Sequence, residues 1–126
     1  LCDRRQRQMC IRDRLTEYLA ICEDLGLSAL VEAYDDAEVD RALAAGARIL
    51  GVNNRNLKTF TVDTENSRRL RARIPQDVLF VSESGVKTAE DVSELAAIGA
   101  DAVLIGETLM RAPDKTAKLR ELKGLL

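Results

Sequence analysis

The chain has 126 residues, a net charge of −2, 46% apolar residues and 32% charged residues. This composition is that of a globular protein and excludes a disordered chain. The slight negative charge argues against nucleic acid or a membrane surface as the main partner. No apolar run approaches the ~20 residues needed to cross a bilayer.

The first fourteen residues differ from the rest, because their charged side chains follow no apolar period. We hypothesise that residues 1–14 are a non-native or disordered leader, resembling translated sequencing-adapter DNA. The alternative is an ordinary basic N-terminal arm. The cysteines at positions 2, 10 and 22 show neither metal-ligand nor disulfide spacing, which favours reduced thiols and a cytoplasmic location.

From residue 15 onward, helix signals alternate with four short apolar runs. Leu15, Tyr18, Leu19, Cys22 and Leu25 fall on one face of a first helix. Strands are expected at residues 27–33, 48–52, 78–82 and 102–105, with helices after each. Alternation of this kind predicts parallel strands joined by helical crossovers. The fold class is therefore α/β, with a (β/α) TIM barrel favoured over an open sheet.

Polar residues end the first two predicted strands, where parallel α/β proteins place their ligands. Glu32 closes an otherwise apolar run, so it either faces a wet pocket as a general acid or base, or pairs with a cation. The chain has no histidine, so acid–base chemistry falls to Glu, Asp or Lys. In the next cluster we favour Asn53 and Arg55 as site residues, and turn chemistry for Asn54 and Asn56.

The third strand runs into Glu83, Ser84 and Gly85, and the fourth into Gly106 and Glu107. Glycine allows close approach of the backbone, so amides after these two strands could bind a phosphate. Barrels often place a phosphate site after their last two strands. The alternative is that both glycines only form tight turns.

Four segments together resemble the C-terminal half of the indole-3-glycerol-phosphate synthase family. They are Leu30-Val31-Glu32, residues 51–60 (GVNNRNLKTF), residues 81–86 (VSESGV) and residues 104–111 (LIGETLMR). The resemblance runs from about residue 15 to the end and implies a (β/α)8 barrel truncated to about its last four strand–helix units. Residues 15–126 would form this half-barrel, which has about half of the ~250 residues of a complete barrel.

The resemblance also implies an activity in tryptophan biosynthesis, with no metal or organic cofactor. Members of the family are carbon–carbon lyases that close and decarboxylate 1-(2-carboxyphenylamino)-1-deoxyribulose 5-phosphate to indole-3-glycerol phosphate. The catalytic residues would be Glu32, Asn53, Glu83 and Ser84. Arg55 would bind the substrate near its anthranilate carboxylate, and Gly85, Gly106 and Glu107 would offer main-chain contacts to the phosphate.

The family takes its essential lysines from strands that this chain lacks, so we expect the chain alone to have negligible activity. Its unpaired strand edges predict self-association into a barrel-like dimer, aggregation or a loosely packed monomer. Two other functions stay open. A phosphoribosylanthranilate isomerase would need a cysteine–aspartate pair at strand ends, and no cysteine lies there. The other is a non-catalytic, phosphate-binding half-barrel.

Overall fold

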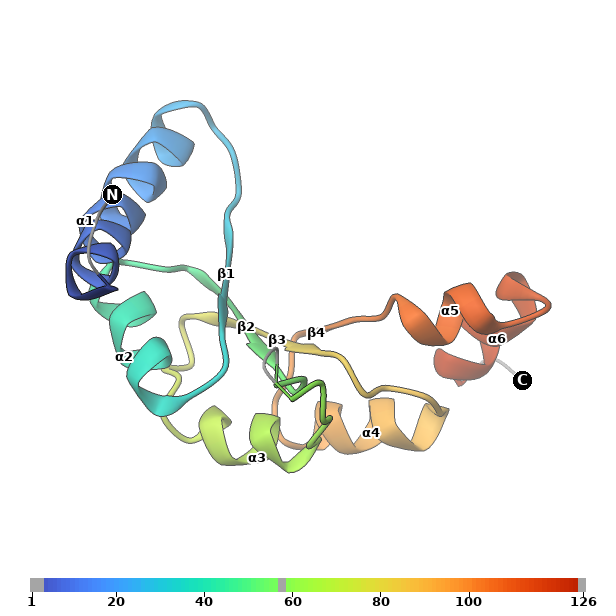
Figure 1. Ribbon diagram of the computed structural model, residues 1–126. Helices are drawn as coiled ribbons and strands as arrows, with labels where there is room; N and C mark the ends of the chain where they lie inside the picture. The colour runs from blue at the N-terminus through green and yellow to red at the C-terminus, as the bar shows by residue number, and fades with distance from the viewer. Residues whose placement is uncertain (1–3, 57–58, 125–126) are drawn as a thin grey trace.

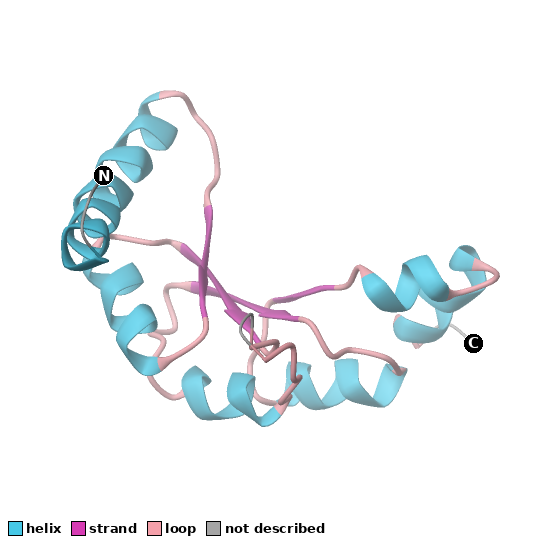
Figure 2. Cartoon of the chain, viewed as in Figure 1, coloured by secondary structure: helices cyan, strands magenta, loops and turns pink. Residues whose placement is uncertain are grey.

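Four parallel strands form one sheet in the order β1-β2-β3-β4 (Figures 1 and 2). The computed structural model describes residues 4–56 and 59–124, the side chains of residues 4–13 excepted. The strands are β1 (Leu30–Ala33), β2 (Ile49–Asn53), β3 (Leu79–Glu83) and β4 (Ala102–Leu104). Each strand pairs in parallel with its neighbour in sequence. The predicted parallel α/β order is confirmed, with strand limits shifted by at most three residues.

Helices connect the strands and lie along one side of the sheet. The first four are α1 (Arg4–Asp24), α2 (Asp36–Ala44), α3 (Glu65–Arg71) and α4 (Ala89–Ala97). In Figure 1 they form an arc around this side. Beyond β4 follow α5 (Glu107–Arg111) and α6 (Lys115–Leu122). The arrangement is that of consecutive strand–helix units of a barrel wall.

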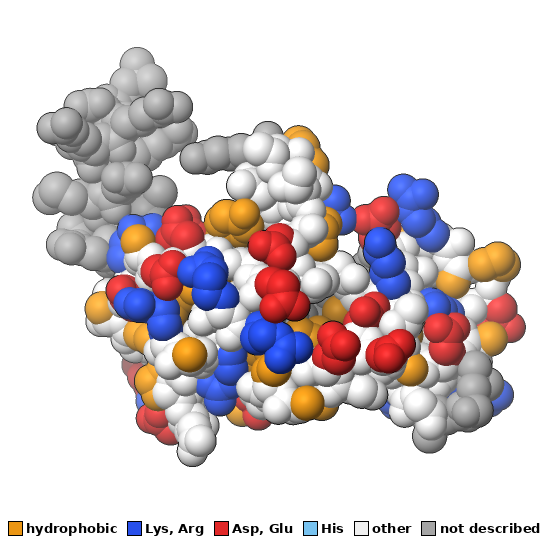
Figure 3. Space-filling model, turned by 90° about the horizontal axis from the view of Figure 1, so that it is seen from below, with side chains coloured by type: hydrophobic (Ala, Val, Ile, Leu, Met, Phe, Trp, Pro, Cys, Tyr) orange, Lys and Arg blue, Asp and Glu red, His pale blue; other side chains and the backbone are white. Residues whose placement is uncertain are grey.

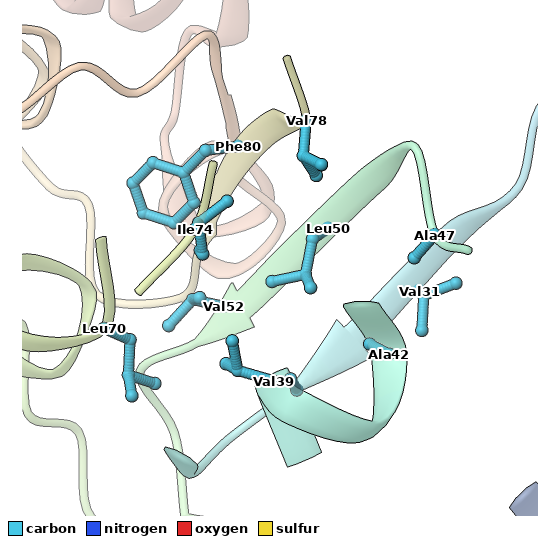
Figure 4. Close-up of a cluster of buried hydrophobic side chains, with 11 residues drawn as sticks. Val31, Val39, Ala42, Ala47, Leu50, Val52, Leu70, Ile74, Val78 and Phe80 are labelled. Carbon is cyan, nitrogen blue, oxygen red and sulfur yellow. The ribbon is translucent and has the colours of Figure 1, made fainter. Parts of the chain in front are cut away.

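Between the sheet and these helices lies the main apolar core (Figure 4). Alternate strand residues point into it, because successive side chains of a strand lie on opposite faces. The buried members from the sheet are Val31, Ala33, Leu50, Val52 and Phe80. Val39 and Ala42 of α2 and Leu70 of α3 cover them. Each large apolar side chain buried in this way contributes roughly 1.5–3 kcal/mol.

The opposite face of the sheet is open. Its side chains come from the other strand positions, and three of the leucines among them are strongly exposed: Leu30 by 40%, Leu79 by 50% and Leu104 by 48%. In the described part of the chain no helix packs on this face (Figure 1). In a closed barrel this face points into the interior, where layers of apolar side chains fill the space. The helices therefore cover one face of the sheet, and the face that would line the interior of a barrel is not covered.

Side-chain caps mark the starts of two helices. The Asp35 side chain accepts a hydrogen bond from the Glu38 backbone at the start of α2. Thr88 and Asp91 form a reciprocal capping box at the start of α4. Such short-range signals are readable in sequence because both partners lie within one helical turn.

The first helix differs from the prediction. It begins at Arg4 instead of near residue 15, so residues 4–14 are helical; their non-native origin remains a prediction, and residues 1–3 lie outside the described residues. Leu15 and Leu19 pack against the core, whereas Tyr18 and Leu25 are exposed. The apolar face predicted for this helix therefore included two residues, Tyr18 and Leu25, that do not contact the core.

Acidic and basic side chains intermingle on the outer surface of the helices (Figure 3). Arg69 of α3 pairs with Asp36 of α2, and Arg73 pairs with Asp36 and Asp40. The guanidinium of Arg69 lowers the pKa of the Asp36 carboxyl. This surface is a charged exterior. No helix within the described residues is long and apolar enough to cross a bilayer.

Candidate functional site at the carboxyl edge of the sheet

The polar residues predicted at the strand ends lie at one edge of the open face. Asn53 of β2 is in register with Glu83 of β3, and Glu32 of β1 is in register with Gly51. Since side chains two residues apart share a face, Glu32, Asn53 and Glu83 all belong to the open side. Sequence spacing alone could suggest this edge, and the register now places the three residues on it.

Glu83 is the most unusual residue of this edge. Its residue surface is only 2% exposed, and Oε1 is buried without a hydrogen-bond partner among the described residues. Burial, and then the charge of Glu32, raise the pKa of the Glu83 carboxyl to about 7. Both causes disfavour a second negative charge at this place. Glu83 therefore exchanges a proton near neutral pH.

Glu32 is exposed and makes no ion pair with any described residue. The alternative of a structural salt bridge is therefore not realised in the described part of the chain. Its carboxylate interacts with Glu83 through charge, across the row that contains Gly51. Two carboxylates in different surroundings are a common basis for acid–base chemistry.

Ser84 occupies a sharp corner directly after β3. Its φ is +65°, in the left-handed region that only a few per cent of non-glycine residues adopt, and Gly85 follows with φ +90°. The Ser84 hydroxyl donates a 2.9 Å hydrogen bond to Oδ1 of Asn53. The Arg55 backbone N–H donates to the same oxygen, also at 2.9 Å. Asn53 and Ser84 are therefore brought into direct contact.

The side chain of Asn53 is oriented by these two hydrogen bonds. Both donors bind Oδ1, which leaves the NH2 group of the Asn53 carboxamide outside these two hydrogen bonds. No described residue accepts a hydrogen bond from this NH2 group. This donor of Asn53 has no partner among the described residues.

A cavity of about 820 Å³ opens beside this edge, between the ends of β3 and β4 and the last helices. Ser84, Gly85, Gly106, Glu107 and Arg55 all line it, whereas Glu32 and Asn53 do not. The cavity also has three further basic residues in its wall, namely Lys87, Arg111 and Lys118. A cavity with this lining suits an anion.

Glu107 is held by two arginines at the cavity wall. Nη2 of Arg55 lies 2.6 Å from Oε2 of Glu107, and Nε of Arg111 lies 3.0 Å from Oε1. The Glu107 carboxylate is thereby turned towards cations, and its charge is largely offset. The predicted use of its backbone amide by a phosphate stays compatible with this geometry.

The two glycines of the predicted phosphate site have different surroundings. A Cβ at Gly85 would lie 2.9 Å from side-chain carbons of Val62 and Thr64, so this glycine makes room for the loop after β2. A Cβ at Gly106 would meet nothing within 4 Å. Gly85 is therefore required by packing and by its positive φ, while Gly106 leaves backbone open to the cavity.

The residues just behind this edge were not predicted to matter. Asn54, expected in a turn, is fully buried and hydrogen-bonds Ser82, Ser84 and Ser67. Asn56 does serve a turn, because its Oδ1 accepts from the Thr59 backbone. No local signal distinguishes these two asparagines, since the partners of Asn54 lie 13 to 30 residues away in sequence.

Within the described residues no group of three or more His, Cys, Asp or Glu side chains could hold a metal ion. Parallel strands in chain order, helices on the outer face and polar residues at the carboxyl edge define part of a (β/α) barrel. A solved complex, BexX/CysO of Amycolatopsis orientalis, has the same fold. It matches with a TM-score of 0.67 and 22% identity, over 90% of this chain and 46% of that one.

Sequence comparison identifies the family within this class. The family model of indole-3-glycerol phosphate synthase matches residues 8–122. The indole-3-glycerol phosphate synthase of Ruminiclostridium cellulolyticum is 62% identical over 112 residues, and that of Leuconostoc mesenteroides is 53% identical over 112 residues. The chain belongs to the indole-3-glycerol phosphate synthase family. Both alignments cover 89% of this chain and 43% of the relative, so the chain spans less than half of their length.

Proposed function

We propose that the barrel to which this chain contributes closes and decarboxylates 1-(2-carboxyphenylamino)-1-deoxyribulose 5-phosphate. The products are indole-3-glycerol phosphate, water and carbon dioxide, as a step of tryptophan biosynthesis. One observation carries the proposal: the Asn53–Ser84 hydrogen bond lies at the edge where Glu83 is buried with a pKa of about 7. A positioned pair of hydrogen-bonding groups and a proton-exchanging carboxyl are the groups that ring closure and dehydration need.

The two carboxyls would share the proton transfers. Glu83 holds its proton near neutral pH because burial opposes its charge, so it suits a general acid or base. Glu32 is exposed on the same face and would exchange protons with the opposite side of the substrate. The NH2 group of Asn53 and the hydroxyl of Ser84 would orient the substrate between the carboxyls.

The two anionic groups of the substrate would use the cavity. We assign the phosphate to the backbone of Gly85, Gly106 and Glu107, with Lys87 as a nearby cation of the cavity wall. We assign the anthranilate carboxylate to Arg55, whose planar guanidinium matches a carboxylate. Arg55 already binds the Glu107 carboxylate, so the substrate would replace that partner.

We further infer a cytoplasmic location and no metal or organic cofactor, and negligible turnover by the 126-residue chain alone. The inner face of the sheet is unfilled, and Oε1 of Glu83 has no donor among the described residues. By the family resemblance, the missing half supplies lysines to this interior. A buried carboxyl without a partner is the place where such a cation would be stabilising.

A chimera tests the proposal. Residues 15–126 of this chain replace the matched segment of the Ruminiclostridium cellulolyticum relative, which supplies the uncovered part of the barrel. We expect the chimera to form indole-3-glycerol phosphate, followed by its fluorescence, and the 126-residue chain alone to form none. Glu83→Gln and Asn53→Ala in the chimera should each lower kcat by about 100-fold or more. Glu90→Gln, on the outer helix α4, is the matched control and should retain the parent rate.

Two results count against the proposal. A chimera that unfolds cooperatively but has no turnover would remove the assigned chemistry. Turnover by the isolated chain at the rate of the chimera would remove the need for a second half. Phosphate-dependent binding of indole-3-glycerol phosphate without turnover would instead favour the non-catalytic binding module.

A further inference from the structure

A buried polar cluster lies between the sheet and α3, on the side away from the open face. We call it the Asn54 cluster; it consists of Asn54, Ser67 and Ser82, whose exposed fraction is 0% for each. Oδ1 of Asn54 accepts hydrogen bonds from the Ser67 hydroxyl at 2.8 Å and from the Ser67 backbone N–H at 3.1 Å. Nδ2 of Asn54 donates to the Ser82 hydroxyl at 3.2 Å. The hydroxyls of Ser67 and Ser82 are 2.8 Å apart and also hydrogen-bond.

Asn54 also holds the backbone on both sides of Ser84. Its backbone N–H donates to the carbonyl of Glu83 at 2.9 Å, and its Nδ2 donates to the carbonyl of Ser84 at 3.0 Å. The first carbonyl belongs to the peptide before Ser84 and the second to the peptide after it. One residue therefore fixes both peptide planes that define the φ and ψ angles of Ser84.

These two hydrogen bonds matter because the left-handed backbone conformation of Ser84 is unfavourable. A non-glycine residue in the left-handed region is strained and persists only where the surroundings impose it. Ser84 has φ +65°, and its hydroxyl reaches Oδ1 of Asn53 from this conformation. Relaxation of Ser84 to an extended conformation would turn the hydroxyl away from Asn53.

The fold alone does not require such a cluster. Apolar residues of the same shape can replace a fully satisfied set of hydrogen bonds with little change in stability. Buried hydrogen bonds are instead directional, and in a low-dielectric interior they resist distortion. The hydrogen bonds of the Asn54 cluster therefore define the position of the backbone at the carboxyl edge more narrowly than apolar packing would.

We propose that Asn54 is a positioning residue of the synthase reaction: through Ser84 it sets the geometry of the Asn53–Ser84 pair. The proposal rests on the proposed function for its kinetic part. Asn54 acts from outside the cavity, because it is completely buried and is not among the residues that line the cavity. Misplacement of such groups by about 1 Å costs up to about 100-fold in rate.

Two variants separate positioning from simple stability. Asn54→Ala removes the hydrogen bond to the Ser84 carbonyl. Ser67→Ala removes a hydrogen bond of the same cluster but leaves both contacts of Asn54 to Glu83 and Ser84 in place. In the chimera we expect Asn54→Ala to lower kcat about 10- to 100-fold with KM within about twofold. Ser67→Ala should lower Tm while kcat stays within about twofold of the parent.

A second readout uses the 126-residue chain and does not depend on activity. The ¹³Cα and ¹³Cβ chemical shifts of Ser84 report whether its backbone is left-handed. They should move to extended values in Asn54→Ala and stay unchanged in Ser67→Ala. Should Asn54→Ala fail to fold, Asn54→Ser keeps a polar group beside Ser67 and Ser82 but is too short to reach the Ser84 carbonyl. It should shift Ser84 in the same way.

The outcomes are distinct. Equal losses of kcat in Asn54→Ala and Ser67→Ala, or a left-handed Ser84 in Asn54→Ala, would overturn the positioning role. An inactive parent chimera would contradict the proposed function, and the Ser84 shifts would still decide whether Asn54 controls this corner.

Discussion

The Glu83 carboxyl lies over Gly51, at the position where β2 has no side chain on the open face. A Cβ built on Gly51 would overlap Oε1 of Glu83 and lie 2.8 Å from its Cδ. Gly51 itself is buried, and its register partner on β3 is Val81. The glycine therefore provides the space in which the Glu83 carboxyl is desolvated, and this desolvation is the main cause of its raised pKa.

Gly51→Ala should expel the Glu83 carboxyl without unfolding the chain. The overlapping atoms are the end of a flexible side chain, which can rotate towards the open face. Once in water, the carboxyl loses its desolvation and its pKa should fall from about 7 towards the ordinary 4.5. A ¹³C NMR titration of the Glu83 side chain measures this shift. A pKa that stays near 7 in Gly51→Ala would show that Gly51 does not control the burial of Glu83.

The pH dependence of stability should carry the mark of Glu83. Its folded pKa, about 7, lies above the ordinary 4.5, so the folded chain holds this proton more tightly than the unfolded chain. Stability from this group is then complete below about pH 4.5 and is lost as the pH rises to about 7. Asp91 has the opposite effect. Desolvation raises the pKa of its carboxyl, but the hydrogen bonds from the N–H groups of Lys87 and Thr88 outweigh this and lower the pKa below its ordinary value. Stability from Asp91 is therefore lost as the pH falls into the acidic range.

Urea unfolding between pH 5 and 8 tests this assignment. The parent should lose stability across that range, and Glu83→Gln should show a flatter profile, because the neutral amide cannot lose a proton. Glu90→Gln, exposed on α4, is the control and should follow the parent curve. Parallel curves for the parent and Glu83→Gln would contradict the raised pKa.

The sequence predicted the outer layer of this fold well, because its signals are local. The alternation of strands and helices follows from the periodicity within each element, and a cap such as the Thr88–Asp91 box needs only one helical turn. The residue types of the site could also be predicted from their place at strand ends. The surroundings of Glu83 could not, because Gly51 lies 32 positions away and only the sheet register brings the two together.

The surroundings of other residues could not be predicted for the same physical reason. Asn54 and Asn56 look alike in sequence, yet Asn54 belongs to a buried polar cluster, whereas Asn56 stabilises a turn. The place of Gly85 after β3 could be read from the sequence, whereas its close packing against Val62 and Thr64 could not. Tertiary contacts decided each case, and hydrophobic periodicity contains no information about them.

Glu107→Gln should strengthen anion binding in the cavity. The Glu107 carboxylate neutralises Arg55 and Arg111, and the amide would leave both cations available to a phosphate. Exposed pairs of this kind are worth roughly 0.2–1 kcal/mol, so affinity for inorganic phosphate should rise about two- to fivefold. Chemical-shift titration of the Gly106 amide at low salt measures it, and the gain should shrink at high salt.

Glu65→Gln is the matched control for this experiment. It removes a carboxylate that pairs with Arg68 on the outer helix α3, away from the cavity. The net charge changes equally in both variants, so a general charge effect would appear in each. Equal gains in Glu107→Gln and Glu65→Gln would mean that the Arg55–Glu107 pair does not compete with the anion.

The open sheet face should make the isolated chain self-associate. Leu30, Leu79 and Leu104 are exposed apolar side chains of this face, and they lie on a sheet with unpaired edges; both features favour association. Leu79→Ser combined with Leu104→Ser should weaken association by about tenfold, because each buried leucine contributes roughly 1.5–3 kcal/mol and burial at an interface is partial. Sedimentation equilibrium measures the change. Ile21→Ser, an equally exposed apolar site on α1, is the control and should associate like the parent. A monomeric parent at high concentration, or equal weakening by Ile21→Ser, would exclude the open face as the association surface.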